Sequence, residues 1–170
     1  MAVFTNGACL SNGNTTARGG YAFVYNTQES GTVSDALEEK GPDGQAYIPT
    51  HNRAKLRAVI AALSFRIWWD EGWERFVIIS DSEYVTKGAT DWLRLWALRN
   101  WKKRSGIKVA NQDLWRELSE KMGKLAEGGC EVLFWAVPRA QNTTANQAAK
   151  NAAMHKEAQK EYTSHPGVLV

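Results

Sequence analysis

FVIISDSEYV, residues 76–85, is a short apolar run that ends abruptly in a carboxylate, Asp81, with a serine on either side. The run is too short for a helix and is rich in β-branched side chains, so it predicts a buried strand. Asp81 then lies at the carboxyl end of that strand. In sheets that carry helices on their faces, ligands and catalytic groups gather at this edge, which makes Asp81 a candidate functional residue.

A structural role for Asp81 is the alternative, because a helix is predicted to begin at residue 82. Ser80, Asp81 and Ser82 each carry an oxygen that can accept a hydrogen bond from the first free N–H groups of that helix. An Asp considered alone at such a position is more often a cap than a catalyst. The rest of the chain has to decide between the two roles.

The composition is that of one globular domain. The chain has 170 residues, 44% of them hydrophobic and 23% charged, and no linker or break in composition favours a second domain. We expect a domain over residues 1–158 and a tail over 159–170. Two cysteines are too few for a disulfide framework, and no apolar run approaches membrane-spanning length. The expected location is intracellular, in the nucleus or the cytoplasm.

The first part of the chain predicts three strands followed by a helix. Strands at residues 2–9, 21–26 and 31–38 are joined by short connections, which favours an antiparallel meander. From residue 50 to 68 the pattern predicts an amphipathic helix capped by Thr50 or Asn52. Its apolar residues recur at spacings of three and four, at Leu56, Val59, Ile60, Leu63 and Ile67.

The second half of the chain predicts further helices and two more strands. After strand 76–80 we expect a short helix that ends near Gly88, and then a helix with Trp92 and Trp96 on one face. Asn111 is the predicted cap of a helix over residues 112–126. A fifth strand is predicted at 131–137 and a final helix at 143–161.

Basic residues are concentrated between Trp92 and Gln112, a segment that contains no acid. They are Arg94, Arg99, Lys102, Lys103, Arg104 and Lys108. A run of positive charges beside tryptophans favours contact with a phosphate backbone over an ordinary solvated surface. The net charge of +3 adds only a weak indication of a polyanionic partner.

Five spaced motifs, taken in order, resemble the ribonuclease H family, whose cellular members cut the RNA strand of RNA/DNA hybrids. They are FTNGAC at 4–9, NRAKL at 52–56, ISDSEYV at 79–85, W-x3-W at 92–96 and NTTANQAA at 142–149. The resemblance runs from residue 2 to about 155 and is closest to the fungal branch. It implies an α/β fold with a mixed five-stranded sheet, its first three strands antiparallel, and helices on both faces.

The family resemblance also implies a catalytic site of four carboxylates that hold two Mg²⁺ ions. Such a pair of ions activates a water and stabilises the leaving oxygen. The four matching positions here are Asn6, Lys55, Asp81 and Asn146, and only Asp81 keeps a carboxylate. An amide supplies no charge, and the Lys55 ammonium repels a metal ion. We therefore expect no metal cofactor and no two-metal hydrolysis.

Two hypotheses describe Lys55. In the first, its ammonium takes the place of magnesium and forms an internal ion pair with Asp81, which turns a catalytic site into a structural one. In the second, Lys55 extends into solvent on its flexible stem.

The resemblance also assigns binding positions. Asn12 and Asn52 match residues that contact the minor groove and RNA 2′-hydroxyls, and Thr50 and Asn111 match part of a phosphate pocket in which Ile48 replaces a basic residue. Tyr84, Trp92 and Trp96 match a channel for the DNA strand, with Lys102, Lys103 and Arg104 beyond it. Core packing is the alternative role of the two tryptophans.

The favoured interpretation is a catalytically inactive ribonuclease H-like protein that binds RNA/DNA hybrid or other duplex nucleic acid. The first alternative is an active metal-dependent ribonuclease with an altered site. The second is a protein-interaction module without nucleic-acid binding. Hybrid cleavage and the salt dependence of hybrid binding separate the three.

Overall fold

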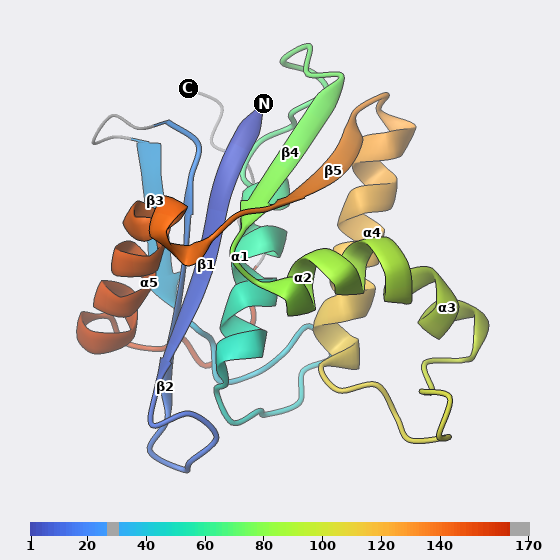
Figure 1. The fold of residues 1–170 in the computed structure, drawn as a ribbon. Helices are drawn as coiled ribbons and strands as arrows, with labels where there is room; N and C mark the ends of the chain where they lie inside the picture. The colour runs from blue at the N-terminus through green and yellow to red at the C-terminus, as the bar shows by residue number, and fades with distance from the viewer. Residues whose placement is uncertain (27–30, 164–170) are drawn as a thin grey trace.

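A mixed five-stranded sheet forms the centre of the molecule (Figure 1). The computed structural model describes residues 1–26 and 31–163. The strands follow the order β3-β2-β1-β4-β5, with β1–β2 and β2–β3 antiparallel and β1–β4 and β4–β5 parallel, which confirms the predicted sheet. Their bounds are β1 Ala2–Leu10, β2 Arg18–Val24, β3 Thr32–Ala36, β4 Arg75–Ser80 and β5 Glu131–Ala136.

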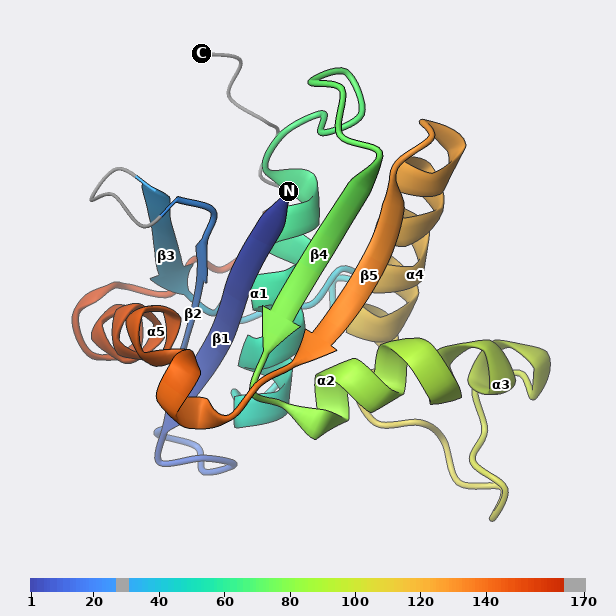
Figure 2. The same cartoon turned by 45° about the horizontal axis from the view of Figure 1, so that its top comes forward.

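Helices cover both faces of the sheet (Figure 2). α5 packs on β1, β2 and β3 from one side, whereas α1 packs on β1 and β2 from the other side, with α4 next to it. The helical segments are α1 His51–Ser64, α2 Glu83–Lys87, η2 Gly88–Trp92, α3 Leu93–Leu98, α4 Gln112–Glu127, η3 Arg139–Gln141 and α5 Thr143–His155. No helix of the described residues is both long and apolar enough to cross a bilayer.

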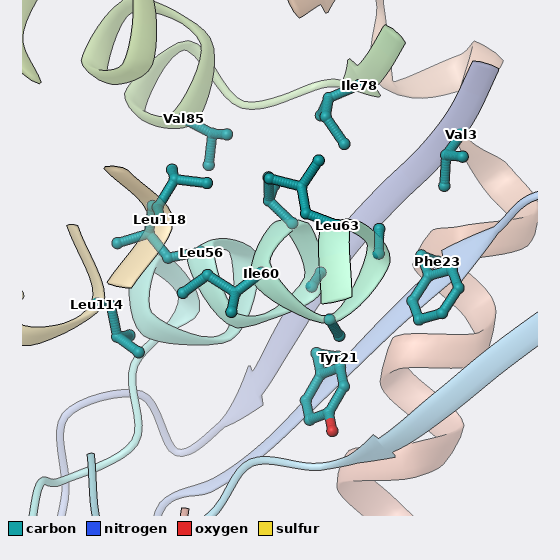
Figure 3. Packing of buried hydrophobic residues seen from close by; sticks show 14 of the residues in the cluster. Val3, Tyr21, Phe23, Leu56, Ile60, Leu63, Ile78, Val85, Leu114 and Leu118 are labelled. Atoms are coloured by element: carbon teal, nitrogen blue, oxygen red, sulfur yellow. The ribbon is translucent and has the colours of Figure 1, made fainter. Parts of the chain in front are cut away.

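The main core lies between α1 and the sheet (Figure 3). Leu56, Ile60 and Leu63 are buried on the face predicted from their spacing and belong to one cluster with Tyr21 and Phe23 of β2. Figure 3 shows Leu56 beside Leu114 and Leu118 of α4. Burying a side chain of this size contributes roughly 1.5–3 kcal/mol. The core therefore fixes α1 against the sheet.

α1 ends earlier than the sequence pattern predicts. Its last residue is Ser64, and Ile67, predicted on the buried face, is 42% exposed. Trp68 occupies the core instead: it is fully buried, its Nε1 donates to the carbonyl oxygen of Ala62 at 2.9 Å, and its ring packs on Phe76 at 4.9 Å. The end of α1 at Ser64 lets Trp68 fill the core in place of Ile67. Hydrophobic spacing alone does not predict this exchange.

α2 ends at Lys87 with Gly88 as its C-cap, which confirms the predicted helix end near Gly88, but the chain does not leave helical structure there. α2 continues through a π-helical turn, η2, into α3. A Cβ on Gly88 would lie 2.2 Å from the ring of Trp115, so this glycine permits close packing of η2 on α4 rather than a turn.

α5 stops at His155, whereas the alanine-rich pattern predicted a helix to residue 161. The next residues run extended beside β2 and β3. The Lys156 ammonium donates to the carbonyl oxygen of Ser34, and the Glu39 N–H donates to the carbonyl oxygen of Gln159 at 2.9 Å. Residues 159–163, expected in the tail, thus lie against the domain, and 164–170 fall outside the described residues.

Candidate functional site

The four positions implied by the family resemblance line one open hollow of about 280 Å³. Asn6 belongs to β1, Asp81 follows β4, Lys55 lies on α1 and Asn146 on α5. We call it the central hollow; its residues are Asn6, Gly7, Ala8, His51, Lys55, Asp81, Arg139, Asn146 and Lys150. Residues from five separate parts of the chain therefore meet at the edge predicted for Asp81.

Gly7 allows α1 to come close to β1 at this hollow. A Cβ on Gly7 would lie 2.2 Å from the backbone of Ala54 and Lys55, so only glycine fits. The close crossing brings Lys55 next to Asn6. Asn6 is 3% exposed, and its Oδ1 accepts a hydrogen bond from the Gly7 N–H at 2.8 Å.

Asp81 is not the cap of the helix that follows it. Ser82 is the N-cap of α2, and its hydroxyl oxygen accepts from the Val85 N–H at 3.4 Å. The Asp81 Oδ1 instead accepts from the Asn142 Nδ2 at 3.4 Å. Of the two roles considered for Asp81, the structure removes the structural cap and leaves a carboxylate at the hollow.

Asn142 joins two strands at the site. Its Nδ2 donates to the carbonyl oxygen of Thr5 on β1 at 3.0 Å and to Asp81 after β4. The side chain is 1% exposed. Asn142 is not among the site residues predicted from the sequence, although it opens the NTTANQAA motif.

The hypothesis of a Lys55–Asp81 ion pair is wrong. Among residues 1–26 and 31–163, no ion pair within 4.0 Å involves Lys55, Arg139 or Lys150. Lys55 is half-buried in the wall of the hollow, so it does not extend freely into solvent either. With His51 neutral, three cations face one carboxylate, a formal charge of +2.

The side chains of the central hollow do not fit two magnesium ions. Mg²⁺ needs anionic oxygens, and Asp81 supplies the one carboxylate of the hollow. The Asn6 Oδ1 already accepts a hydrogen bond from the Gly7 N–H, and the other polar atom of the side chain, Nδ2, is a donor that does not bind a metal ion. In the part of the chain that the structure describes, no group of three or more His, Cys, Asp or Glu residues could hold a metal ion.

The cations of the hollow also act on His51. Partial burial lowers the pKa of His51 from its ordinary 6.5, and the positive charges of Lys55 and Arg139 lower it further. The unfolded chain therefore binds this proton more tightly than the folded protein. The contribution of His51 to stability is complete above pH 6.5 and is lost as the pH falls below that value.

We expect Lys55→Gln to raise the pKa of His51, because the substitution removes one of its two positive neighbours. An NMR titration of the His51 ring in both proteins measures this. An unchanged pKa would contradict the placement of Lys55 beside the histidine.

A second hollow, of about 420 Å³, lies under α2 and α3. Tyr84, Trp92 and Trp96 line it together with Lys103. The Trp92 and Trp96 rings lie 5.7 Å apart, and Trp96 packs edge-on against the buried Trp115 at 5.3 Å. Trp96 is thus partly a packing residue, whereas Trp92 is 37% exposed.

Thr50 and Asn111 lie close together because both bind Arg53. The Arg53 N–H donates to the Thr50 hydroxyl oxygen at 3.2 Å, which makes Thr50 the cap of α1, and the Arg53 Nη1 donates to Asn111 Oδ1 at 3.4 Å. The Arg53 guanidinium is itself paired with Asp113 at 2.7 Å. Ile48 is exposed and lines a different hollow from Asn111, so among the described residues these three positions do not form one pocket.

Asn111 is the N-cap residue of α4, as predicted, but its side chain does not make the expected capping bond. Asn111 occupies the cap position with a left-handed backbone, φ 57°, and makes no side-chain cap bond. Its Nδ2 donates instead to the Tyr84 hydroxyl at 3.1 Å, which ties the start of α4 to α2.

Asn12 and Asn52 lie together at the start of α1. The Asn12 Oδ1 accepts from the His51 N–H at 2.8 Å, and both asparagines are exposed. His51 lines the central hollow, whereas Asn12 and Asn52 do not line it but are joined to His51 by a hydrogen bond and by the chain.

The basic segment forms a protruding hairpin-like loop after α3 (Figure 1). Lys102 and Lys108 pair as an antiparallel bridge, and the Lys103 N–H donates to the carbonyl oxygen of Ile107 at 2.8 Å. Lys102, Lys103 and Arg104 are exposed, and none of them lies within 4.0 Å of a described carboxylate. These charges are free to meet a polyanion.

Comparison with known proteins agrees with the fold and the motifs. The RNase H family model matches residues 1–155. Ribonuclease H of Treponema pallidum is 36% identical over 124 residues, a match that covers 70% of each chain. RNase H1 of the archaeon Halobacterium salinarum is 25% identical, with a TM-score of 0.53 over 89% of this chain and 95% of that one.

A more distant structure shares the fold. The foamy viral protease-reverse transcriptase in complex with RNA/DNA hybrid is 16% identical, with a TM-score of 0.65 over 89% of this chain and 20% of that one. The family model spans nearly all of the described residues. The chain belongs to the ribonuclease H family.

Proposed function

We propose that this protein binds RNA/DNA hybrid, or a similar nucleic-acid duplex, without hydrolysing it. The observation that carries the proposal is the central hollow, where Asp81 is the one carboxylate among the four family positions and three cationic residues also line the hollow. Membership of the ribonuclease H family supplies the expected substrate class.

Loss of hydrolysis follows from charge. A two-metal displacement needs a site that neutralises two dications, and four carboxylates do so. The central hollow has a formal charge of +2 before any metal arrives, with His51 neutral. Each dication that entered would add to a formal charge that is already positive. The hollow therefore has no metal ion to activate a water for attack on the phosphodiester.

Binding, by contrast, needs no metal. Lys103 of the basic loop, the partly exposed Trp92 and Tyr84 line the same hollow. Positive side chains that track a backbone, with an aromatic surface beside them, are the usual means of holding nucleic acid. The distant foamy viral relative was captured with RNA/DNA hybrid.

One experiment tests the proposal directly. A labelled RNA/DNA hybrid is titrated with the protein in EDTA, and then incubated with it in Mg²⁺ and in Mn²⁺. We expect binding that weakens steeply with salt, and an intact RNA strand in both metals. Cleavage would establish the active ribonuclease instead, and absence of binding at low salt would favour a protein-interaction module.

We expect the basic loop, which carries Lys102, Lys103 and Arg104 after α3, to set the salt dependence of hybrid binding. Replacing Lys102, Lys103 and Arg104 by alanine should lower the slope of log affinity against log salt by up to about 3, roughly one for each phosphate that the variant can no longer neutralise. Lys124→Ala is the matched control, because Lys124 lies at the far end of α4 in an exposed pair with Glu120. Equal slopes in the triple variant and the control would exclude this loop from the interface.

A further inference from the structure

We infer that the central hollow holds one backbone phosphate of nucleic acid directly, through Lys55, Arg139, Lys150 and the amide of Asn6, in the place where relatives with four carboxylates would hold metal ions. The inference rests on the proposed function, since it states how the altered site contacts the bound duplex. It assigns a ligand to residues that would otherwise be remnants of a lost site.

The three cations converge from different elements. Lys55 comes from α1, Arg139 from η3 and Lys150 from α5. Both lysines are half-buried, and no carboxylate of residues 1–26 or 31–163 lies within 4.0 Å of any of the three charged groups. Like charges gathered in a partly buried hollow repel one another, and an anion between them relieves that repulsion.

Asn6 provides independent evidence for an anion. Its side chain is 3% exposed, and its Nδ2 is buried with no hydrogen-bond partner among the described residues. Buried donors almost always have an acceptor, because leaving one unpaired is costly. A carboxylate at residue 6 would present an acceptor for a cation, whereas the amide presents a donor. A phosphate oxygen would supply the missing acceptor once the side chain turns its NH₂ toward the hollow, whose lining includes Asn6.

The chemistry favours a phosphodiester over other anions. The planar guanidinium of Arg139 matches two phosphate oxygens, and two ammonium groups add point charges around them. The hollow is open to solvent, with a volume of about 280 Å³, so a phosphate within a longer backbone can enter it. Asn12 accepts from the N–H of the lining residue His51, and Asn52 follows His51 on α1, so exposed amides for the rest of a duplex lie near the hollow.

Asp81 does not oppose this assignment. Its Oδ1 is engaged by the Asn142 Nδ2 at 3.4 Å, and its single charge is outnumbered by three cations. The net positive charge therefore remains available to the phosphate.

Inorganic phosphate tests the hollow without any nucleic acid. The Asn6 side-chain NH₂ is followed by NMR while phosphate replaces chloride at constant ionic strength in EDTA. We expect a saturable downfield shift, with binding weakened about tenfold in Lys55→Gln, because the substitution removes one charge-assisted hydrogen bond. Lys124→Gln, which removes an equal charge far from the hollow, should behave like the unmodified protein. No saturable shift, or the same affinity in Lys55→Gln, would overturn the inference.

A hybrid with single methylphosphonate substitutions tests the same interaction in the nucleic acid. Neutralising the one phosphate that enters the hollow should weaken binding about tenfold, and this effect should be smaller in Lys55→Gln because one of the three partner charges is already gone. Equal effects at all positions, or effects that persist unchanged in Lys55→Gln, count against the inference.

The two arms separate this inference from the proposed function. If phosphate binds at Asn6 but the hybrid does not bind, the proposed function fails and the hollow remains an anion site. If the hybrid binds and neither arm depends on Lys55, the proposed function stands and this inference falls. The melting temperature of each variant, measured in parallel, excludes loss of folding as the cause.

Discussion

The Asn6→Asp, Lys55→Glu, Asn146→Asp variant is expected to cleave the RNA strand of an RNA/DNA hybrid in Mg²⁺, while the unmodified protein leaves it intact. The triple change restores four carboxylates to a hollow whose backbone frame is already in place, since all four positions line it. Metal ions supply several kcal/mol of transition-state stabilisation, so the rate should rise by at least about 10³-fold.

The same variant should respond to metal in a second way. Four carboxylates in one hollow repel each other without cations, so Mg²⁺ should raise the melting temperature of the variant but not that of the unmodified protein. Adding Asp81→Asn to the triple variant is the control, and it should abolish both effects. Cleavage by the unmodified protein at a rate close to that of the variant would show that the carboxylates are not the missing element.

Local patterns in the sequence predict the strands and most of the helices because they record which residues are buried. Leu56, Ile60 and Leu63 fall on the buried face that their spacing indicates. Ile67 does not, because Trp68 turns the chain inward after Ser64 to fill the core. Helix ends depend on such single tertiary contacts, which spacing does not record.

The site was predictable only where a motif marked it. The family resemblance placed Asn6, Lys55, Asp81 and Asn146, and the structure brings them together. No motif marks Arg139 or Lys150 as a site residue, although Lys150 lies one helical turn beyond Asn146 on the same helix. The place of Arg139 and Lys150 in the hollow depends on how distant elements of the chain converge. The absence of a Lys55–Asp81 ion pair depends on it too. Neither can be seen in a linear pattern.

Breaking the buried ion pair between Arg57 and Glu38 is expected to cause a large fall in the free energy of unfolding. The Arg57 Nη2 lies 2.7 Å from Glu38 Oε1, with side-chain exposures of 1% and 3%. Tyr21 and Tyr162 each lie 4.6 Å from the guanidinium, and the Thr163 hydroxyl donates to Glu38 at 3.1 Å. The pair therefore joins α1, the segment after β3 and the end of the described chain.

Glu38→Ala leaves the Arg57 guanidinium buried without its counter-charge, so the free energy of unfolding should fall by about 3–5 kcal/mol. Glu161→Ala is the matched control: it breaks the exposed pair with Lys40 in the same region, and should cost less than about 1 kcal/mol. Denaturant unfolding of both variants measures the difference. A decrease in Glu38→Ala no larger than in the control would mean that the guanidinium escapes to water, and that α1 is held to the sheet by apolar packing alone. The expected decrease would instead make Arg57, two residues along α1 from Lys55, part of what keeps the central hollow in shape.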